Sequence, residues 1–226
     1  MAKRPVFITN NLPPHYEEIN TEFKYYSGFA DSQRKKSSYS LKEAFMVKHP
    51  DAEVLEVSRF SENVLGQRLS AFNLLLTTPG GKKMPVENVF QAGKVFESGG
   101  PYEDLLNVSP AAAKKDPRLK SSGSITEFSY FGQSFPTEPK TFFYDWLYMS
   151  ALSENEDISK ELLSFNAFTD IVFNPEKSLN CQARTVAIYV SLVRSGLIEE
   201  AMKSPESFKF LVYGNAEGLF IQESLF

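Results

Sequence analysis

The chain has 226 residues, of which 42% are hydrophobic and 14% aromatic, and its formal net charge is −4. This composition predicts one substantial hydrophobic core and excludes an intrinsically disordered chain. A single cysteine, Cys181, excludes an internal disulfide framework, and the two histidines, His15 and His49, lack the spacing of metal ligands. We therefore expect a reaction site that uses no metal and no other cofactor.

Charge and hydropathy also bear on location and partners. The opening residues MAKRP lack the apolar segment of a signal peptide, and no run approaches the ~18 apolar residues of a membrane helix. We therefore expect a cytoplasmic protein that does not bind membranes. The negative net charge disfavours binding of long duplex DNA through a broad basic surface, so any contact with nucleic acid should be local.

In the first half of the chain, turn and cap signals predict short strands and helices in alternation. Residues 6–9 and 53–57 are typical of strands. Residues 40–43, SLKE, have the capping-box pattern and predict a helix that begins there. A hairpin-like turn over 77–83 precedes a helix that begins at about Pro85.

The second half contains longer apolar elements. Ser109 and Pro110 predict the start of an alanine-rich helix. Further helices are expected over 142–152 and 182–194, and strands over 167–173 and in a closing pair over 208–213 and 218–222.

The most informative segment is 84–96, MPVENVFQAGKVF. Glu87, Gln91 and Lys94 are spaced i, i+4 and i+7, which places them along one stripe of a helix at ~100° per residue. The remaining positions are largely apolar, and an acid and an amine on such a helix suggest a reaction site. The alternative is a solvated edge whose charges only improve solubility.

Four sequence blocks resemble those of one protein family. LSAFN at 69–73, PVENVFQAGK at 85–94, SPAAAKK at 109–115 and NCQAR at 180–184 occur in the order and at the spacing of the NADAR superfamily, also called YbiA-like. The match covers roughly residues 59 to 197. The resemblance implies an α+β protein with a predominantly helical YbiA-like domain and short peripheral strands over 59–226, and an N-terminal α+β extension over 1–58 packed on it.

NADAR proteins are N-glycosidases, and the N-terminal segment resembles the branch that acts as antitoxin to DarT-type toxins. The resemblance implies removal of ADP-ribose from ADP-ribosylated guanine in single-stranded DNA, with ADP-ribose as product and a DarT-type toxin as a further partner. Two alternatives stay open. One is a non-catalytic module that binds ADP-ribose or neutralises the toxin, and the other is a hydrolase of a small phosphoribosyl metabolite.

Three residues are candidates for catalysis. Cleavage of a ribosyl C1–N bond develops positive charge at C1 and the ring oxygen, which the carboxylate of Glu87 would stabilise. Lys94, desolvated among apolar neighbours, is either a nucleophile that forms a Schiff base or an ammonium that binds phosphate. Asp170 is either a second catalytic acid or a residue on the solvent-exposed face of a strand.

Further residues are candidates for binding. For substrate, the candidates are Phe60, Ser61, Phe72, Asn73, Gln91, Asn180 and Arg184. Phe72 is alternatively a core residue, and Asn180 and Arg184 alternatively form a plain helix cap with a surface arginine. For nucleic acid, the candidates are Arg34, Lys35 and Lys36 near several tyrosines, or else these three form a solvated basic turn.

Overall fold

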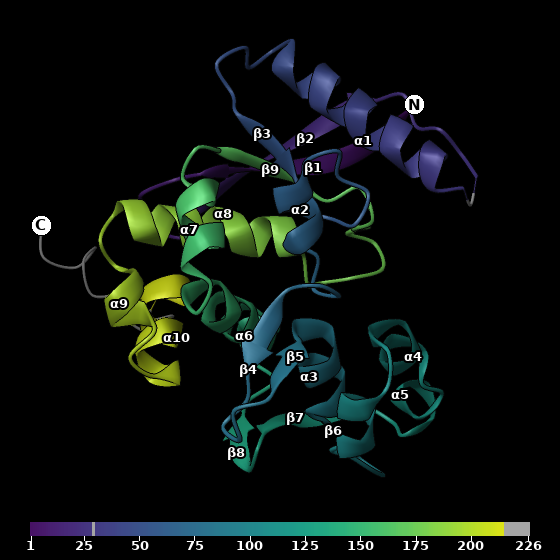
Figure 1. Cartoon of the computed structure of the whole chain (residues 1–226), viewed down its shortest axis with the longest axis vertical. Helices are drawn as coiled ribbons and strands as arrows, with labels where there is room; N and C mark the ends of the chain where they lie inside the picture. Colours follow the sequence, from purple (N-terminus) through teal and green to yellow (C-terminus); the bar gives the residue numbers. More distant parts are fainter. Residues whose placement is uncertain (29, 215–226) are drawn as a thin grey trace, which may run out of the picture. The chain divides into compact units, whose positions relative to one another are not determined.

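The computed structural model describes residues 1–28 and 30–214 (Figure 1). Of these residues, 41% lie in helices and 19% in strands, and the strands form several sheets. The fold is therefore a mixed α+β structure, and the expectation of a predominantly helical domain with short peripheral strands is wrong. The chain divides into two compact units. Unit 1 comprises residues 1–56, 162–172 and, as far as they are described, 183–214; unit 2 comprises 57–161 and 173–182.

Unit 1 is built on a four-stranded sheet in the order β2-β1-β9-β3. Its strands are β1 (Ala2–Thr9), β2 (Tyr16–Phe23), β3 (Val54–Glu56) and β9 (Ala167–Thr169). β1 runs antiparallel to β2 and β9, whereas β3 and β9 are parallel. The predicted strands at 6–9 and 53–57 are found here, whereas the strand predicted over 167–173 ends at Thr169. β2 was missed because its sequence, YEEINTEF, is rich in exposed glutamates and lacks a regular apolar alternation.

Helix α1 (Asp31–Met46) packs on this sheet and begins nine residues before the predicted capping box. Its buried positions Ser37, Ser38, Leu41 and Phe45 share one face, so packing on the sheet extends the helix beyond its local cap signal.

The C-terminal helices of unit 1 are most of α8 (Gln182–Arg194), α9 (Ile198–Ala201) and α10 (Pro205–Tyr213). α8 agrees with the prediction, and Asn10 N–H donates to Ser191 Oγ at 3.1 Å to tie it to the end of β1. The predicted strand at 208–213 is wrong, because Ser204 caps α10 and these residues are helical. Its expected partner at 218–222 lies outside the described residues.

Unit 2 surrounds α3 (Val86–Ala92) with short elements. They are α2 (Val64–Arg68), β4 (Leu75–Thr77), β5 (Lys83–Pro85), β6 (Lys94–Phe96), η1 (Glu103–Asn107), α4 (Pro110–Lys115), α5 (Arg118–Ser121), β7 (Ile125–Tyr130), β8 (Gln133–Phe135), α6 (Phe142–Ser153) and α7 (Glu156–Leu162). The β4–β5 hairpin leads directly into α3, and the antiparallel sheet β6-β7-β8 follows it.

An aromatic cluster fixes α3 in unit 2. The ring of Phe90 lies 5.8 Å from that of Phe128 on β7 and 5.2 Å from that of Tyr144 on α6, and Phe128 stacks on Phe143 at 4.9 Å. Aromatic contacts at these distances add to the free energy of burial. All seven residues of α3 are buried, so its polar side chains are held inside the protein.

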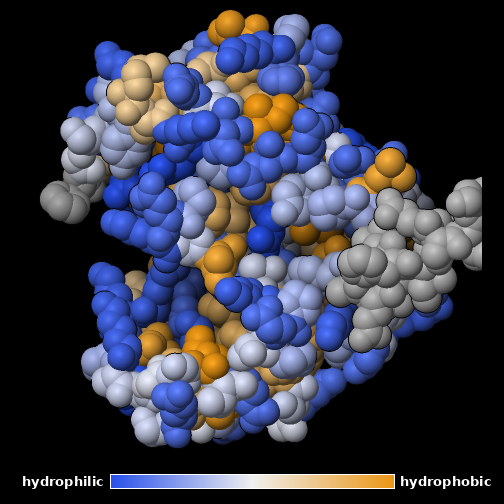
Figure 2. Space-filling model, turned by 180° about the vertical axis from the view of Figure 1, so that it is seen from behind, coloured by the Kyte–Doolittle hydropathy of each residue, from blue (hydrophilic) through white to orange (hydrophobic). Residues whose placement is uncertain are grey.

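The surface is mostly hydrophilic on the face that Figure 2 shows, with small hydrophobic patches between hydrophilic residues. Among the described residues, no helix combines the length and the apolar character needed to cross a membrane.

Candidate active site

The helix that carries the predicted site starts as expected and ends earlier. Pro85 is its N-cap in an extended conformation, and the helix ends at Ala92 with Gly93 as C-cap. A Cβ on Gly93 would lie 2.5 Å from the carbonyl oxygen of Ser129, and Ser129 N–H donates to the carbonyl of Gly93 at 2.7 Å. Close pairing with β7 therefore ends α3, and Lys94 belongs to strand β6 rather than to the helix.

Glu87, Gln91 and Lys94 nevertheless form one hydrogen-bonded row. Gln91 Nε2 donates to Glu87 Oε1 at 2.8 Å, and Lys94 Nζ donates to Gln91 Oε1 at 2.7 Å. Glu87 is 4% exposed and Gln91 is 5% exposed. A solvated edge is excluded by this burial, because side chains on such an edge would face water.

The amine of Lys94 is in an unusual environment. The pKa of Lys94 is lowered from 10.5 to about 8, mainly by burial; the negative charge of Glu87 raises this pKa, and the positive charge of Lys114 lowers it. Its Nζ also lies 4.7 Å from the centre of the Phe90 ring. Half of the Lys94 side chains are therefore neutral amines near pH 8, and a neutral amine can act as a nucleophile.

Lys114 on α4 is a charged member of this site that the sequence interpretation missed. Its Nζ lies 3.5 Å from Glu87 Oε1 and 5.4 Å from the centre of the Phe72 ring, and its side chain is 57% exposed. The signal was present in the SPAAAKK block, but nothing local to that block indicates which neighbour its lysines face.

The backbone at Ala71 holds the start of α3. Glu87 N–H donates to the carbonyl of Ala71 at 2.9 Å. The side-chain amide of Gln182 links two parts of the backbone. Its Oε1 accepts from Ala71 N–H and its Nε2 donates to the carbonyl of Val57, both at 2.8 Å. Gln182 was missed as well, although it lies in the NCQAR block. It supports the segment that carries Phe72.

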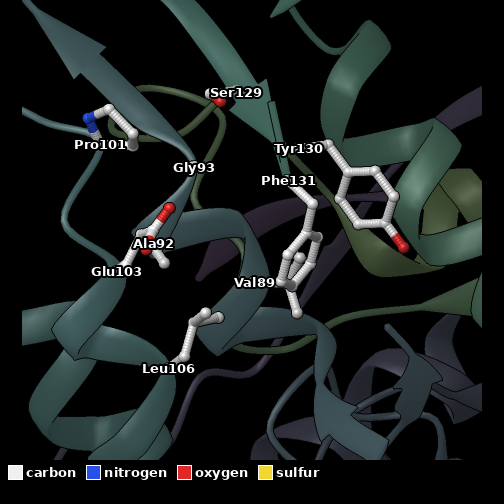
Figure 3. Close-up of a pocket in the computed structure, with 9 residues that line it drawn as sticks. All are labelled: Val89, Ala92, Gly93, Pro101, Glu103, Leu106, Ser129, Tyr130 and Phe131. Carbon is white, nitrogen blue, oxygen red and sulfur yellow. The ribbon is translucent and has the colours of Figure 1, made fainter. Parts of the chain in front are cut away.

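A small, partly open pocket lies against the opposite side of α3 (Figure 3). Its lining residues are Val89, Ala92, Gly93, Pro101, Glu103, Leu106, Ser129, Tyr130 and Phe131. In Figure 3 the ring of Phe131 lies beside Val89, and Glu103 is the one charged residue of the lining. The pocket thus has a carboxylate without an amine, and the acid and amine pair lies on the other side of the helix.

The described residues contain no group of three or more histidine, cysteine, aspartate or glutamate side chains placed to hold a metal ion.

Comparison with known families agrees with the four sequence blocks. Residues 2–218 match the model of the DarT1-associated NADAR antitoxins. The chain belongs to this family. The match confirms the resemblance to NADAR proteins and to their DarT-associated branch, and it includes the N-terminal segment. A comparison with curated proteins gives no match.

The other predicted substrate residues of this NADAR antitoxin differ in exposure. Phe72 is half-buried below Lys114, and Asn73 is exposed and donates from Nδ2 to the carbonyl of Gln67 at 2.8 Å. Phe60 and Ser61 are buried, at 6% and 1% exposure. Ser61 Oγ accepts from the backbone N–H of a residue two positions on, which shapes the loop before α2.

Asn180 lies in unit 2, two residues before α8 rather than at its start. Its side-chain oxygen is buried and has no hydrogen-bond partner within the described part of the chain.

The remaining candidates belong to unit 1. Asp170 follows β9, is 7% exposed and accepts from the backbone N–H of Val172 at 3.0 Å, so it does not lie on a wet face. Arg184 is half-buried on α8. Arg34, Lys35 and Lys36 lie in α1, so the solvated basic turn is corrected to the start of a helix, where Lys35 and Lys36 are exposed.

Proposed function

We propose that this NADAR antitoxin is an N-glycosyl hydrolase that removes ADP-ribose from ADP-ribosylated guanine bases in DNA and so reverses the action of a DarT-type toxin. The observation that carries the proposal is the buried row in which the amide of Gln91 joins a carboxylate to an amine of lowered pKa. A module that only binds has no need of a desolvated amine, and titratable groups with perturbed pKa values cluster at functional sites. The family description supports the association with a DarT toxin.

In this proposal Glu87 stabilises the transition state. As the bond between ribose C1 and the guanine nitrogen lengthens, positive charge develops at C1 and the ring oxygen. A carboxylate with little access to water attracts that charge more strongly than it would in solution. The interaction grows as the charge grows, so it lowers the barrier rather than only tightening substrate binding.

Lys94 is proposed as the nucleophile. Its nitrogen lone pair forms a first bond to C1 as the bond from C1 to the guanine nitrogen breaks, and electrons freed by loss of a proton from this nitrogen form the second bond as the bond from C1 to the ring oxygen breaks. The amine has two protons, and one passes to each of the two departing atoms. The result is a neutral imine between Lys94 and C1 of an open-chain sugar, and an unmodified guanine that remains in the DNA. One water then hydrolyses the imine, which restores the amine and releases ADP-ribose.

The DNA must present its modified base outside the stack, because the reacting C1–N bond of a base within a duplex cannot be reached by a buried side chain. We assign contacts with the DNA phosphates to Arg34, Lys35 and Lys36 at the start of α1.

The test is to offer the protein a short single-stranded oligonucleotide with one ADP-ribosylated guanine and to follow both products by liquid chromatography and mass spectrometry. We expect free ADP-ribose and unmodified oligonucleotide, with many turnovers per protein molecule. Release of no more than one equivalent, or of none, would contradict the hydrolase. A parallel reaction with a free phosphoribosyl compound tests the small-substrate alternative.

A further inference from the structure

Lys114 occupies a position that determines how the charges of the site are paired. The direct ion pair of Glu87 is with Lys114, at 3.5 Å, and not with Lys94. Gln91 stands between Glu87 and Lys94: its Nε2 donates to the carboxylate of Glu87, and its Oε1 accepts from the amine of Lys94. A carboxylate and an amine that share a row are thus separated by a neutral amide, and a second lysine offsets the charge of the carboxylate.

This arrangement matters because an unopposed carboxylate holds a nearby amine in its protonated form. A protonated amine has no free lone pair and cannot attack a carbon. Glu87 raises the pKa of Lys94, and Lys114 opposes that effect. On the paired strand β7, the residue opposite Lys94 is the uncharged Phe128, while Glu127 lies opposite Val95. Lys114 is therefore the positive charge that acts on this amine.

The position of Lys114 is fixed by buried contacts between α3 and α4. Ala113 is fully buried and clusters with Ala92 of α3 and with Leu105. The side chain of Asn88, at 1% exposure, donates from Nδ2 to the carbonyls of Leu105 and Val108 at 2.7 and 2.8 Å. These bonds tie the chain immediately before α4 to the residue next to Glu87. An exposed lysine is thereby anchored at its backbone beside a buried carboxylate.

We propose that Lys114 is a positioning residue of the reaction, whose ammonium offsets the charge of Glu87 and so leaves Lys94 as a free amine that can attack the substrate. The inference rests on the proposed function and adds to it a third charged residue, with a role distinct from those of Glu87 and Lys94. Lys114 acts through Lys94 and takes no part in the bonds that form and break.

The first experiment measures Lys94 directly and needs no activity. The full-length protein is acetylated briefly at a series of pH values, and the modification of Lys94 is quantified by mass spectrometry, which gives its titration midpoint. The variants are Lys114→Gln, Lys114→Arg and, as a matched control, Lys115→Gln on the next, exposed position of α4.

In Lys114→Gln we expect the midpoint of Lys94 to rise by about 0.5 to 1 pH unit, which lowers the neutral fraction at pH 7 by about three- to tenfold. Lys114→Arg keeps the charge and should leave the midpoint within about 0.3 unit of the wild-type value, as should Lys115→Gln. A merely structural role for Lys114 would not move this midpoint in the expected direction. An unchanged midpoint in Lys114→Gln, or an equal rise in Lys115→Gln, would overturn the inference.

The second experiment compares pH–rate profiles of the same variants. The rising limb of Lys114→Gln should move to higher pH by the amount of the midpoint shift, and raising the pH should restore its rate. A loss of rate that higher pH does not restore would mean that Lys114 acts in another way, and would refute the positioning role. If wild-type protein hydrolyses nothing while the midpoint shifts as expected, the proposed function fails and the charge relation between the lysines stands.

Discussion

Replacement of Glu87 by glutamine tests the role of the buried carboxylate with the smallest change of shape. The new amide has nearly the same volume, and its oxygen can still accept the N–H of Gln91 that now donates to Glu87 Oε1. What is lost is one negative charge. At an effective dielectric constant of about 20, two unit charges about 4 Å apart attract by about 4 kcal/mol. That loss corresponds to a decrease in kcat of about a thousandfold.

The same substitution should increase the fraction of Lys94 that is a neutral amine, whereas it should decrease the rate, and this difference makes the test decisive. Glu87 raises the pKa of Lys94, so its removal lowers that pKa below about 8 and increases the neutral amine at pH 7. A fall in activity of Glu87→Gln therefore cannot result from protonation of Lys94. It reports the loss of charge stabilisation at C1.

The assay is single-turnover release of ADP-ribose from a modified oligonucleotide, together with calorimetric binding of ADP-ribose. We expect the binding constant to stay within an order of magnitude of wild type. Glu103→Gln, an exposed acid in the pocket on the other side of α3, is the matched control and should remain active. A rate for Glu87→Gln within about threefold of wild type would refute the assignment of the site.

Further predictions concern Lys94 and the basic start of α1. Lys94→Arg should be inactive because a guanidinium stays protonated, and borohydride added during wild-type turnover should trap a reduced adduct on the Lys94 peptide; an active arginine variant would exclude the covalent route. The folded-state pKa of about 8 lies below the usual 10.5, so between these pH values the unfolded state binds more protons and stability rises with pH. From pH 8 to 10.5, denaturation curves should show the wild type gaining about 2.5 kcal/mol relative to Lys94→Met, and parallel curves would contradict the burial of the amine. Alanine at Arg34, Lys35 and Lys36 should weaken binding of the modified oligonucleotide and flatten its salt dependence while sparing the free ADP-ribosyl nucleoside, and equal loss on both would contradict a DNA-contact role.

Local signals in the sequence predicted several elements well. Ser109 caps α4 with Pro110 at its first position, and Thr141 precedes the apolar helix α6 at the expected residue. The Pro85 signal placed the start of α3 correctly. The predictions failed where residues distant in the sequence determine the secondary structure. β2 is a strand because β1 pairs with all eight of its residues, although its glutamates give it little local strand character.

The sequence by itself determined the family and the polar row, because the spacing of Glu87 and Gln91 on a short helix is a local property. The sequence spacing also indicated that Lys94 lies near Gln91. Only the tertiary structure decided that this row is buried, that Lys94 reaches it from a strand, and that Lys114 lies against Glu87. Burial, pKa and ion pairing depend on the residues that surround a side chain in space, and a spacing along the chain does not contain that information.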